Sequence, residues 1–209
     1  MSEANLTMAG HPAVLREESP FAIPSKKLVM WLFIISDSVT FAALLVAYGF
    51  LRNAASNWPQ PFKFSPSIIN VMLMTLILIT SSLTMLIGVR AAQTGDRSKA
   101  FRWILITAAA GTAFAFLHIR EWLGLIDEGV RLFQNPWGSG LFGAAFFSVT
   151  GLHLLHVSAG VVALIVVGLL YHHGRYDSDH LEVLGLYWHF VDIVWMFVVP
   201  LVYLLSIAR

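Results

Sequence analysis

The stretch YWHFVDIVW, residues 187–195, lies within a long apolar run near the C-terminus, yet it holds a histidine, an aspartate and two tryptophans. In a helix, Trp188, Asp192 and Trp195 share one stripe, and His189 lies one turn before Asp192. Each ionisable side chain inside a membrane span costs about 2.5–3.5 kcal/mol on insertion scales, so each needs a partner or a function. We therefore expect His189 and Asp192 to pair with each other or with a neighbouring helix.

The composition of the whole chain is that of a membrane protein. Of its 209 residues, 57% are hydrophobic and only 12% are charged, whereas soluble domains carry about 25% charged residues. A net charge of +1 gives no basic surface for nucleic acid. The absence of cysteine excludes disulfides, thiolate metal sites and cysteine nucleophiles. Any chemistry within the chain therefore rests on histidines and carboxylates.

Five apolar segments are long enough to cross a bilayer, which takes about 20 residues per helix. They are residues 28–50, 68–89, 103–123, 141–171 and 183–207. Linkers rich in proline, glycine or charge separate them. The sequence thus predicts an all-α polytopic membrane protein with five transmembrane helices, in which a cytoplasmic tail of residues 1–26 precedes a five-helix domain of residues 27–209.

The lysines and arginines favour a cytoplasmic N-terminus, because basic residues accumulate on the cytoplasmic side of membrane proteins. With that orientation, the inner side carries Arg16, Lys26, Lys27, Arg90, Arg97, Lys99, Arg102 and Arg175, and the outer side carries Arg52, Lys63, Arg120, Arg131 and Arg209.

Ionisable residues inside the five segments admit three interpretations. They are Asp37 in the first segment, His118 and Glu121 in the third, His153 and His156 in the fourth, and Glu182, His189 and Asp192 in the fifth or at its inner edge. The first interpretation is haem or metal ligation by the four histidines, although His153 and His156, at i and i+3, suit packing better than trans-axial ligation. The second is transport through the aspartates and Glu182, but the two related halves typical of transporters are absent. The third, which physical chemistry favours, is hydrogen bonding between helices, worth about 0.6–2 kcal/mol per contact.

Several of these motifs together resemble subunit III of the haem–copper respiratory oxidases, in the shorter, five-span bacterial form. The similarity runs from Trp31 to Tyr203. It rests on WLFIISDSVTFAALLVAY, INVMLMTLILITSSLTM and FLHIREW, and above all on FFSVTGLHLLHVSAG and EVLGLYWHFVDIVWMFVVPLVYL. The chain departs from the family pattern at three positions. Asp37 occupies the position of the family's usual glutamate, and His118 occupies that of a glutamine. Ser178 occupies the position of a histidine that commonly lies four residues before Glu182.

The resemblance implies an accessory, non-redox subunit of a proton-pumping, oxygen-reducing terminal oxidase in a bacterial inner membrane. Such a subunit packs on subunit I, in a complex that also holds subunit II, binds phospholipid, and supports proton uptake and enzyme lifetime. Haem and copper belong to those partner subunits, so this chain would hold no cofactor. A further small membrane subunit is expected beside the first two spans, because the two additional helices of the seven-span form are missing.

The resemblance also assigns roles to individual residues. Asp37 becomes the candidate for a proton- or lipid-linked group. The intramembrane packing set consists of His118, Glu121, His153, His156, Glu182, Trp188, His189 and Asp192. Two alternatives stay open, namely an accessory subunit of a nitric oxide reductase and a haem-binding membrane electron carrier. The sequence does not distinguish cytochrome c from quinol as the electron donor of the complex.

Overall fold

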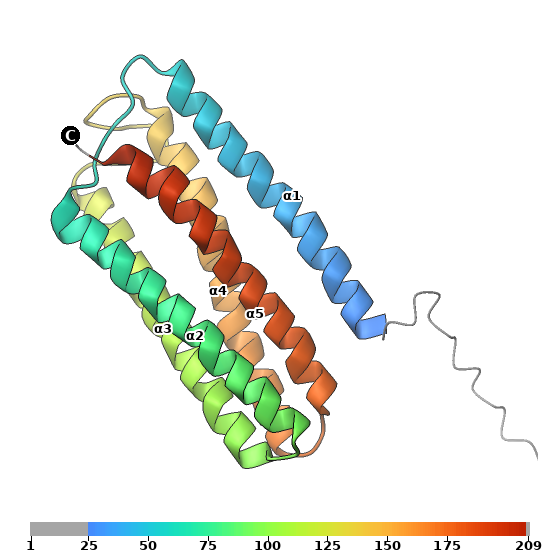
Figure 1. Ribbon diagram of the computed structural model, residues 1–209. Coiled ribbons are helices and arrows are strands. Elements are labelled where there is room, and N and C mark those ends of the chain that lie inside the picture. The colour runs from blue at the N-terminus through green and yellow to red at the C-terminus, as the bar shows by residue number, and fades with distance from the viewer. Residues whose placement is uncertain (1–24, 208–209) are drawn as a thin grey trace, which may run out of the picture.

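The computed structural model describes residues 25–207, and five long helices running up and down make up most of this part of the chain (Figure 1). The helices are α1 (Ser25–Ala54), α2 (Ile69–Gln93), α3 (Arg97–Asp127), α4 (Leu141–His172) and α5 (Ser178–Val198). All five are long and apolar enough to cross a membrane. The prediction of an all-α protein with five spans is therefore confirmed. The cytoplasmic location of the N-terminus stays a prediction, and residues 1–24 of the expected tail lie outside the described residues, as do Arg16 and Arg209.

Two helices extend well beyond the apolar segments because aspartates cap their first turns. The carboxylate of Asp96 accepts a hydrogen bond from the backbone N–H of Lys99 at 2.9 Å, so α3 begins at Arg97 instead of residue 103. Asp177 caps α5 in the same way, through the backbone N–H of His180 at 3.3 Å. Such caps satisfy N–H groups that have no partner within the helix, and hydropathy alone does not detect them.

Pro200 changes the helical geometry near the C-terminus. A proline lacks an N–H donor, and its ring clashes with the carbonyl group four residues earlier in an α-helix. The chain therefore continues α5 as a wider π-helical turn, η2 (Val199–Tyr203), and then as a short 3₁₀ turn, η3 (Leu204–Ser206). A second π-helical turn, η1 (Phe64–Ile68), leads into α2. The extension of α5 carries Tyr203 into the interior, where the residue is fully buried.

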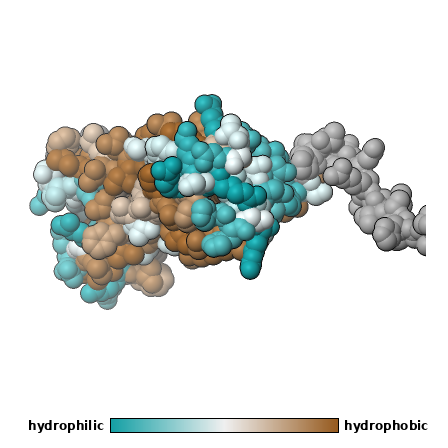
Figure 2. Space-filling model, turned by 90° about the horizontal axis from the view of Figure 1, so that it is seen from below, coloured by the Kyte–Doolittle hydropathy of each residue, from teal (hydrophilic) through white to brown (hydrophobic). Residues whose placement is uncertain are grey.

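The first helix lies at the edge of the bundle formed by the other four (Figure 1). It packs mainly on α4, α5 and η2. Phe41 and Tyr48 are its only buried residues, while Val39, Val46 and Phe50 are 65–71% exposed. An end-on view shows hydrophilic residues gathered at the near end of the molecule and hydrophobic residues along its flanks (Figure 2). The flanks thus have the surface expected for contact with lipid or with other membrane helices.

Candidate functional site

Three side chains of residues 187–195, those of Trp188, His189 and Trp195, pair with hydroxyl groups on α2. Indole N–H and hydroxyl groups need partners when they leave water. Two of these hydroxyl oxygens accept a hydrogen bond from an indole N–H of α5, and the third forms a hydrogen bond with an imidazole nitrogen of α5. The pairs are Trp188 Nε1 to Ser81 Oγ at 3.0 Å, Trp195 Nε1 to Thr75 Oγ1 at 3.0 Å, and His189 Nδ1 with Ser82 Oγ at 2.5 Å. These contacts fix the register of α5 against α2.

Trp188 lies in a slot between two glycines of other helices. A Cβ atom on Gly111 of α3 would lie 2.5 Å from Cη2 of Trp188, and one on Gly160 of α4 would lie 2.9 Å from its Cζ3. Both distances are too short for real Cβ contacts. The indole is fully buried, so its position depends on both glycines and on the bond to Ser81. Trp188 thereby holds α2, α3, α4 and α5 together.

The four histidines considered as haem or metal ligands do not converge on one point. His118 and His153 are fully buried beside Trp195, with ring centroids 5.4 and 4.9 Å from the indole. Nε2 of His153 lies 3.2 Å from the carbonyl oxygen of Val191, and neither ring nitrogen of His118 has a hydrogen-bond partner. His189 instead faces α2, and His156 faces α1. Residues 25–207 contain no group of three or more histidine, aspartate or glutamate side chains placed to hold a metal ion.

Asp37 of α1 meets His156 of α4, with 2.8 Å between Oδ2 and Nε2. Both side chains are largely buried, at 17% and 13% exposed. The contact has the length of an ion pair, although its direction is not that of a hydrogen bond. The ring of Phe41 packs edge-on against the imidazole, with 5.4 Å between centroids. The hydroxyl of Tyr187 donates to the backbone carbonyl of His156 at 2.9 Å, so α1, α4 and α5 meet here.

The surroundings of His156 determine how many protons the pair holds. Nδ1 lies 2.8 Å from the carbonyl oxygen of Leu152. A carbonyl oxygen only accepts, so Nδ1 carries a hydrogen, an assignment based on its partner. An attractive contact between Nε2 and Oδ2 then requires one further proton between them. That proton lies either on Asp37, facing a neutral imidazole, or on the imidazole, facing a carboxylate. The pair therefore joins α1 to α4 through two ionisable side chains of low exposure.

Comparison with known proteins agrees with this arrangement of motif residues. Residues 19–207 match the family model of cytochrome c oxidase subunit III. This chain belongs to the cytochrome c oxidase subunit III family. It is 29% identical to cytochrome c oxidase subunit 3 of Bacillus sp. (strain PS3), over 99% of both chains. It is 33% identical to cytochrome bo(3) ubiquinol oxidase subunit 3 of Pseudomonas aeruginosa, over 84% of this chain and 83% of the relative. The resemblance predicted from the sequence motifs is confirmed, and both kinds of electron donor occur among the names of its relatives.

The partner of Asp37 within this subunit III chain was missed by the sequence analysis. Every lysine and arginine lies near a span end, so none of them is placed to pair with Asp37 inside its span. The structure supplies His156 instead. The resemblance assigned His156 to intramembrane packing, and its contact with Asp37 is one such contact between helices. Glu182, by contrast, pairs with Lys27 at 2.8 Å near the end of the bundle, where both side chains are partly exposed.

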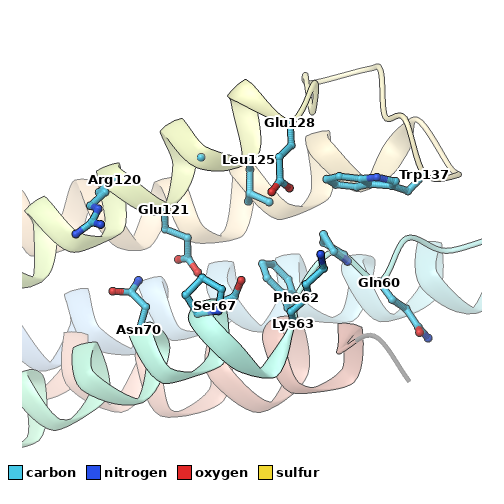
Figure 3. Close-up of a pocket in the computed structure, with 13 residues that line it drawn as sticks. Gln60, Phe62, Lys63, Ser67, Asn70, Arg120, Glu121, Leu125, Glu128 and Trp137 are labelled. Atoms are coloured by element: carbon cyan, nitrogen blue, oxygen red, sulfur yellow. The ribbon is translucent and has the colours of Figure 1, made fainter.

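The remaining acidic residues of the subunit III packing set line cavities. Glu121 of α3 points toward Asn70 and Ser67 across a cavity of about 500 Å³ at the end of the bundle that holds the α1–α2 connection (Figure 3). One of its oxygens, Oε2, accepts a hydrogen bond from the hydroxyl of Tyr203 at 2.9 Å, while Oε1 has no partner. Asp192 is 8% exposed, and neither of its carboxyl oxygens has a hydrogen-bond partner among the described residues. The carboxyl group is buried beside Ser82 of α2, and the expected polar contact of Asp192 stays a prediction.

Removing the Tyr203 hydroxyl should destabilise the end of the bundle that holds the α1–α2 connection. The variant Tyr203→Phe leaves Glu121 with no hydrogen-bond donor at either oxygen, which costs about 1–3 kcal/mol for a buried polar group. The free energy of unfolding, measured by titration with sodium dodecyl sulfate in mixed micelles, should fall by that amount. Tyr176→Phe is the matched control, because the Tyr176 ring stacks on His180 and its hydroxyl makes no hydrogen bond within residues 25–207. Equal stability of the two variants would contradict the role assigned to the Tyr203 hydroxyl.

Proposed function

We propose that this chain is the non-redox accessory subunit of a proton-pumping haem–copper terminal oxidase in a bacterial inner membrane. It packs on subunit I, in a complex that also contains subunit II, and the haem and copper centres belong to those partners. The observation that carries the proposal is the family match over residues 19–207. Relatives that cover 99% and 84% of this chain are named as subunit 3 of a cytochrome c oxidase and of a ubiquinol oxidase, respectively.

Within that complex, the Asp37–His156 pair supports proton uptake and enzyme lifetime. The pair joins the edge helix α1 to the bundle and brings two ionisable side chains of low exposure into contact. The apolar face of α1 beside it, including Val39, Val46 and Phe50, takes bound phospholipid or a helix of a further small subunit. Oxygen chemistry takes place in the partner subunits, and this chain adjusts the surroundings of proton entry.

Purification of the complex tests the proposal directly. An affinity tag on this chain, with extraction in mild detergent, should bring down the catalytic subunit of an oxygen-reducing oxidase as the largest partner. The preparation should reduce oxygen with either reduced cytochrome c or quinol, and the active donor identifies the class of complex. Recovery of a nitric oxide reductase catalytic subunit would instead support the alternative assignment.

The isolated chain should bind no stoichiometric haem. His189 faces α2 and His156 faces α1, while His118 and His153 are fully buried against Trp195 and are not open to a haem. An absorption spectrum of the chain purified without its partners, after incubation with haem, should lack a Soret band of one haem per chain. Such a band, lost in the His153→Ala variant, would contradict the assignment and favour a haem-binding electron carrier.

A further inference from the structure

The first turn of α1 is joined to the first turn of α5 through one histidine. The start of α1 lies at the same end of the bundle as the connection between α4 and α5 (Figure 1). Nζ of Lys26 in α1 lies 3.0 Å from Nε2 of His180 in α5. Nδ1 of the same imidazole contacts a carboxyl oxygen of Asp177, the residue that caps α5. The imidazole therefore lies between an ammonium group and a carboxylate.

These two contacts require a neutral imidazole. An ammonium group only donates hydrogen bonds, so Nε2 of His180 accepts from Lys26 and carries no hydrogen. A carboxylate only accepts, so Nδ1 carries the one ring hydrogen and donates it to Asp177, an assignment based on the partners. Protonation of the ring adds a hydrogen at Nε2, the atom that accepts from Lys26. The imidazolium can therefore keep its bond to Asp177, but it loses its bond to Lys26 and repels the ammonium group.

The other groups around His180 are compatible with a charged ring. The ring of Tyr176 stacks on the imidazole with 4.0 Å between centroids, and an aromatic face attracts a cation. The hydrogen bond from His180 holds the pKa of the Asp177 carboxyl below its ordinary value. Among residues 25–207, no side chain of α2, α3 or α4 forms a hydrogen bond or an ion pair with His180. Further charged side chains near it along the chain are Arg175, Asp179 and Glu182.

Burial contributes little to the attachment of this end of α1. Residues 25–40 contain no buried side chain. A second polar contact joins Lys27 to Glu182 of α5 at 2.8 Å. That pair contains no imidazole, the side chain that ordinarily changes charge between about pH 5 and 8. Farther along the helix, the next polar contact with another helix is that of Asp37. The contact between Lys26 and His180 is thus the part of this attachment that depends on the charge of an imidazole.

We propose that His180 is a pH-dependent clasp, which joins the start of α1 to α5 while its imidazole is neutral and releases Lys26 when the imidazole is protonated. The contact is present at alkaline pH and is lost as the pH falls. The cap of α5 survives, because Asp177 accepts from the protonated ring and from the backbone N–H of His180 alike. Acidification at this end of the bundle therefore loosens the edge helix between its first turn and Asp37. The inference concerns contacts within this chain and does not depend on the proposed function.

The distance between two nitroxide labels in the intact complex tests the clasp. The labels are attached to p-acetylphenylalanine, whose ketone reacts without modifying cysteines of partner subunits. One pair, at Val29 of α1 and Leu169 of α4, reports on the clasp end. A control pair is placed at Val46 of α1 and Leu155 of α4, and all four side chains are 41–71% exposed. Double electron–electron resonance should give a longer and broader distance distribution for Val29–Leu169 at about pH 5 than at about pH 8, while Val46–Leu155 should stay unchanged.

Three substitutions assign the change to His180. His180→Gln carries no titrating group, yet its amide oxygen accepts from Lys26, so the short distance should persist at the lower pH. Lys26→Gln can donate to the neutral imidazole and accept from the protonated one, so it should also keep the short distance. His180→Arg cannot accept a hydrogen bond and stays charged, so it should show the long distance even at the higher pH.

The possible results decide the inference. An equal Val29–Leu169 distance at both pH values in the wild type would overturn it, as would lengthening that persists in either glutamine variant. An equal change in Val46–Leu155 would mean that the whole bundle loosens, and would overturn it as well. If His180→Arg does not assemble, the two glutamine variants decide alone, because both keep the link to α5. Recovery of a complex other than an oxidase would overturn the proposed function and leave this test unchanged.

Discussion

Replacement of Gly111 by valine should prevent the helix bundle from assembling. Even the first added carbon, Cβ, would lie 2.5 Å from Cη2 of Trp188 and 2.7 Å from Cγ2 of Val161. Trp188 has no free space to move into, because Gly160 lies against its other edge and its N–H is bonded to Ser81. Overpacking a core costs about 1–3 kcal/mol, occasionally more, and one overlap with a fully buried ring and a second with Val161 place Gly111→Val beyond that range.

Unfolding by sodium dodecyl sulfate in mixed micelles is monitored by circular dichroism, and the midpoint of the transition is measured. Gly111→Ala should already lower this midpoint clearly, and Gly111→Val should yield little folded protein. Gly49→Ala is the matched control, because a Cβ atom there meets nothing within 4 Å. A smaller ring should relieve the overlap, so Trp188→Phe should stabilise the Gly111→Ala chain while destabilising the wild type. If Trp188→Phe does not stabilise the Gly111→Ala chain, the overlap with Trp188 is not the cause of the lowered unfolding midpoint.

Much of this arrangement was predictable from the sequence, because apolar length and motif composition reflect local constraints. The five spans follow from runs of about 20 apolar residues. The role of residues 187–195 as a helix-packing stretch was also expected, since Trp188 and Trp195 fall on one stripe. The hydroxyl groups that pair with these side chains could not be predicted. Choosing Ser81 as the partner of Trp188 requires knowing which helices are neighbours and how far one is shifted along its axis relative to the other. Those quantities depend on the sum of all interhelical contacts.

His153 and His156, three residues apart on α4, contact different helices for a physical reason. Residues at i and i+3 lie about 60° apart around a helix of 3.6 residues per turn. That angle keeps them on one broad face, yet it is wide enough to direct them to different neighbours. His153 turns toward Val191 of α5, and His156 turns toward Asp37 of α1. The position of α1, at the edge of the bundle against α4 and α5, decides this outcome, and no local pattern encodes it.

Loss of the proton shared by Asp37 and His156 should shorten the working life of the oxidase without stopping its chemistry. Asp37→Asn keeps the size of the side chain, and its amide can still donate to Nε2 of His156. It cannot exchange the shared proton, because an amide does not titrate in this range. We therefore expect assembly and the initial rate of oxygen reduction to stay nearly intact, while activity during continuous turnover declines severalfold faster.

The second member of the pair provides the decisive comparison. If Asp37 and His156 act as one proton-holding unit, His156→Gln should accelerate inactivation as much as Asp37→Asn, and the double variant should be no worse than either single variant. Additive effects would instead indicate two separate roles. Collapse of activity at the first turnover would mean that the pair takes part in the oxygen chemistry directly. Unchanged initial and inactivation rates in all three variants would leave Asp37 and His156 as a contact between α1 and α4 alone, since an interhelical bond of about 0.6–2 kcal/mol is then sufficient to account for the pair.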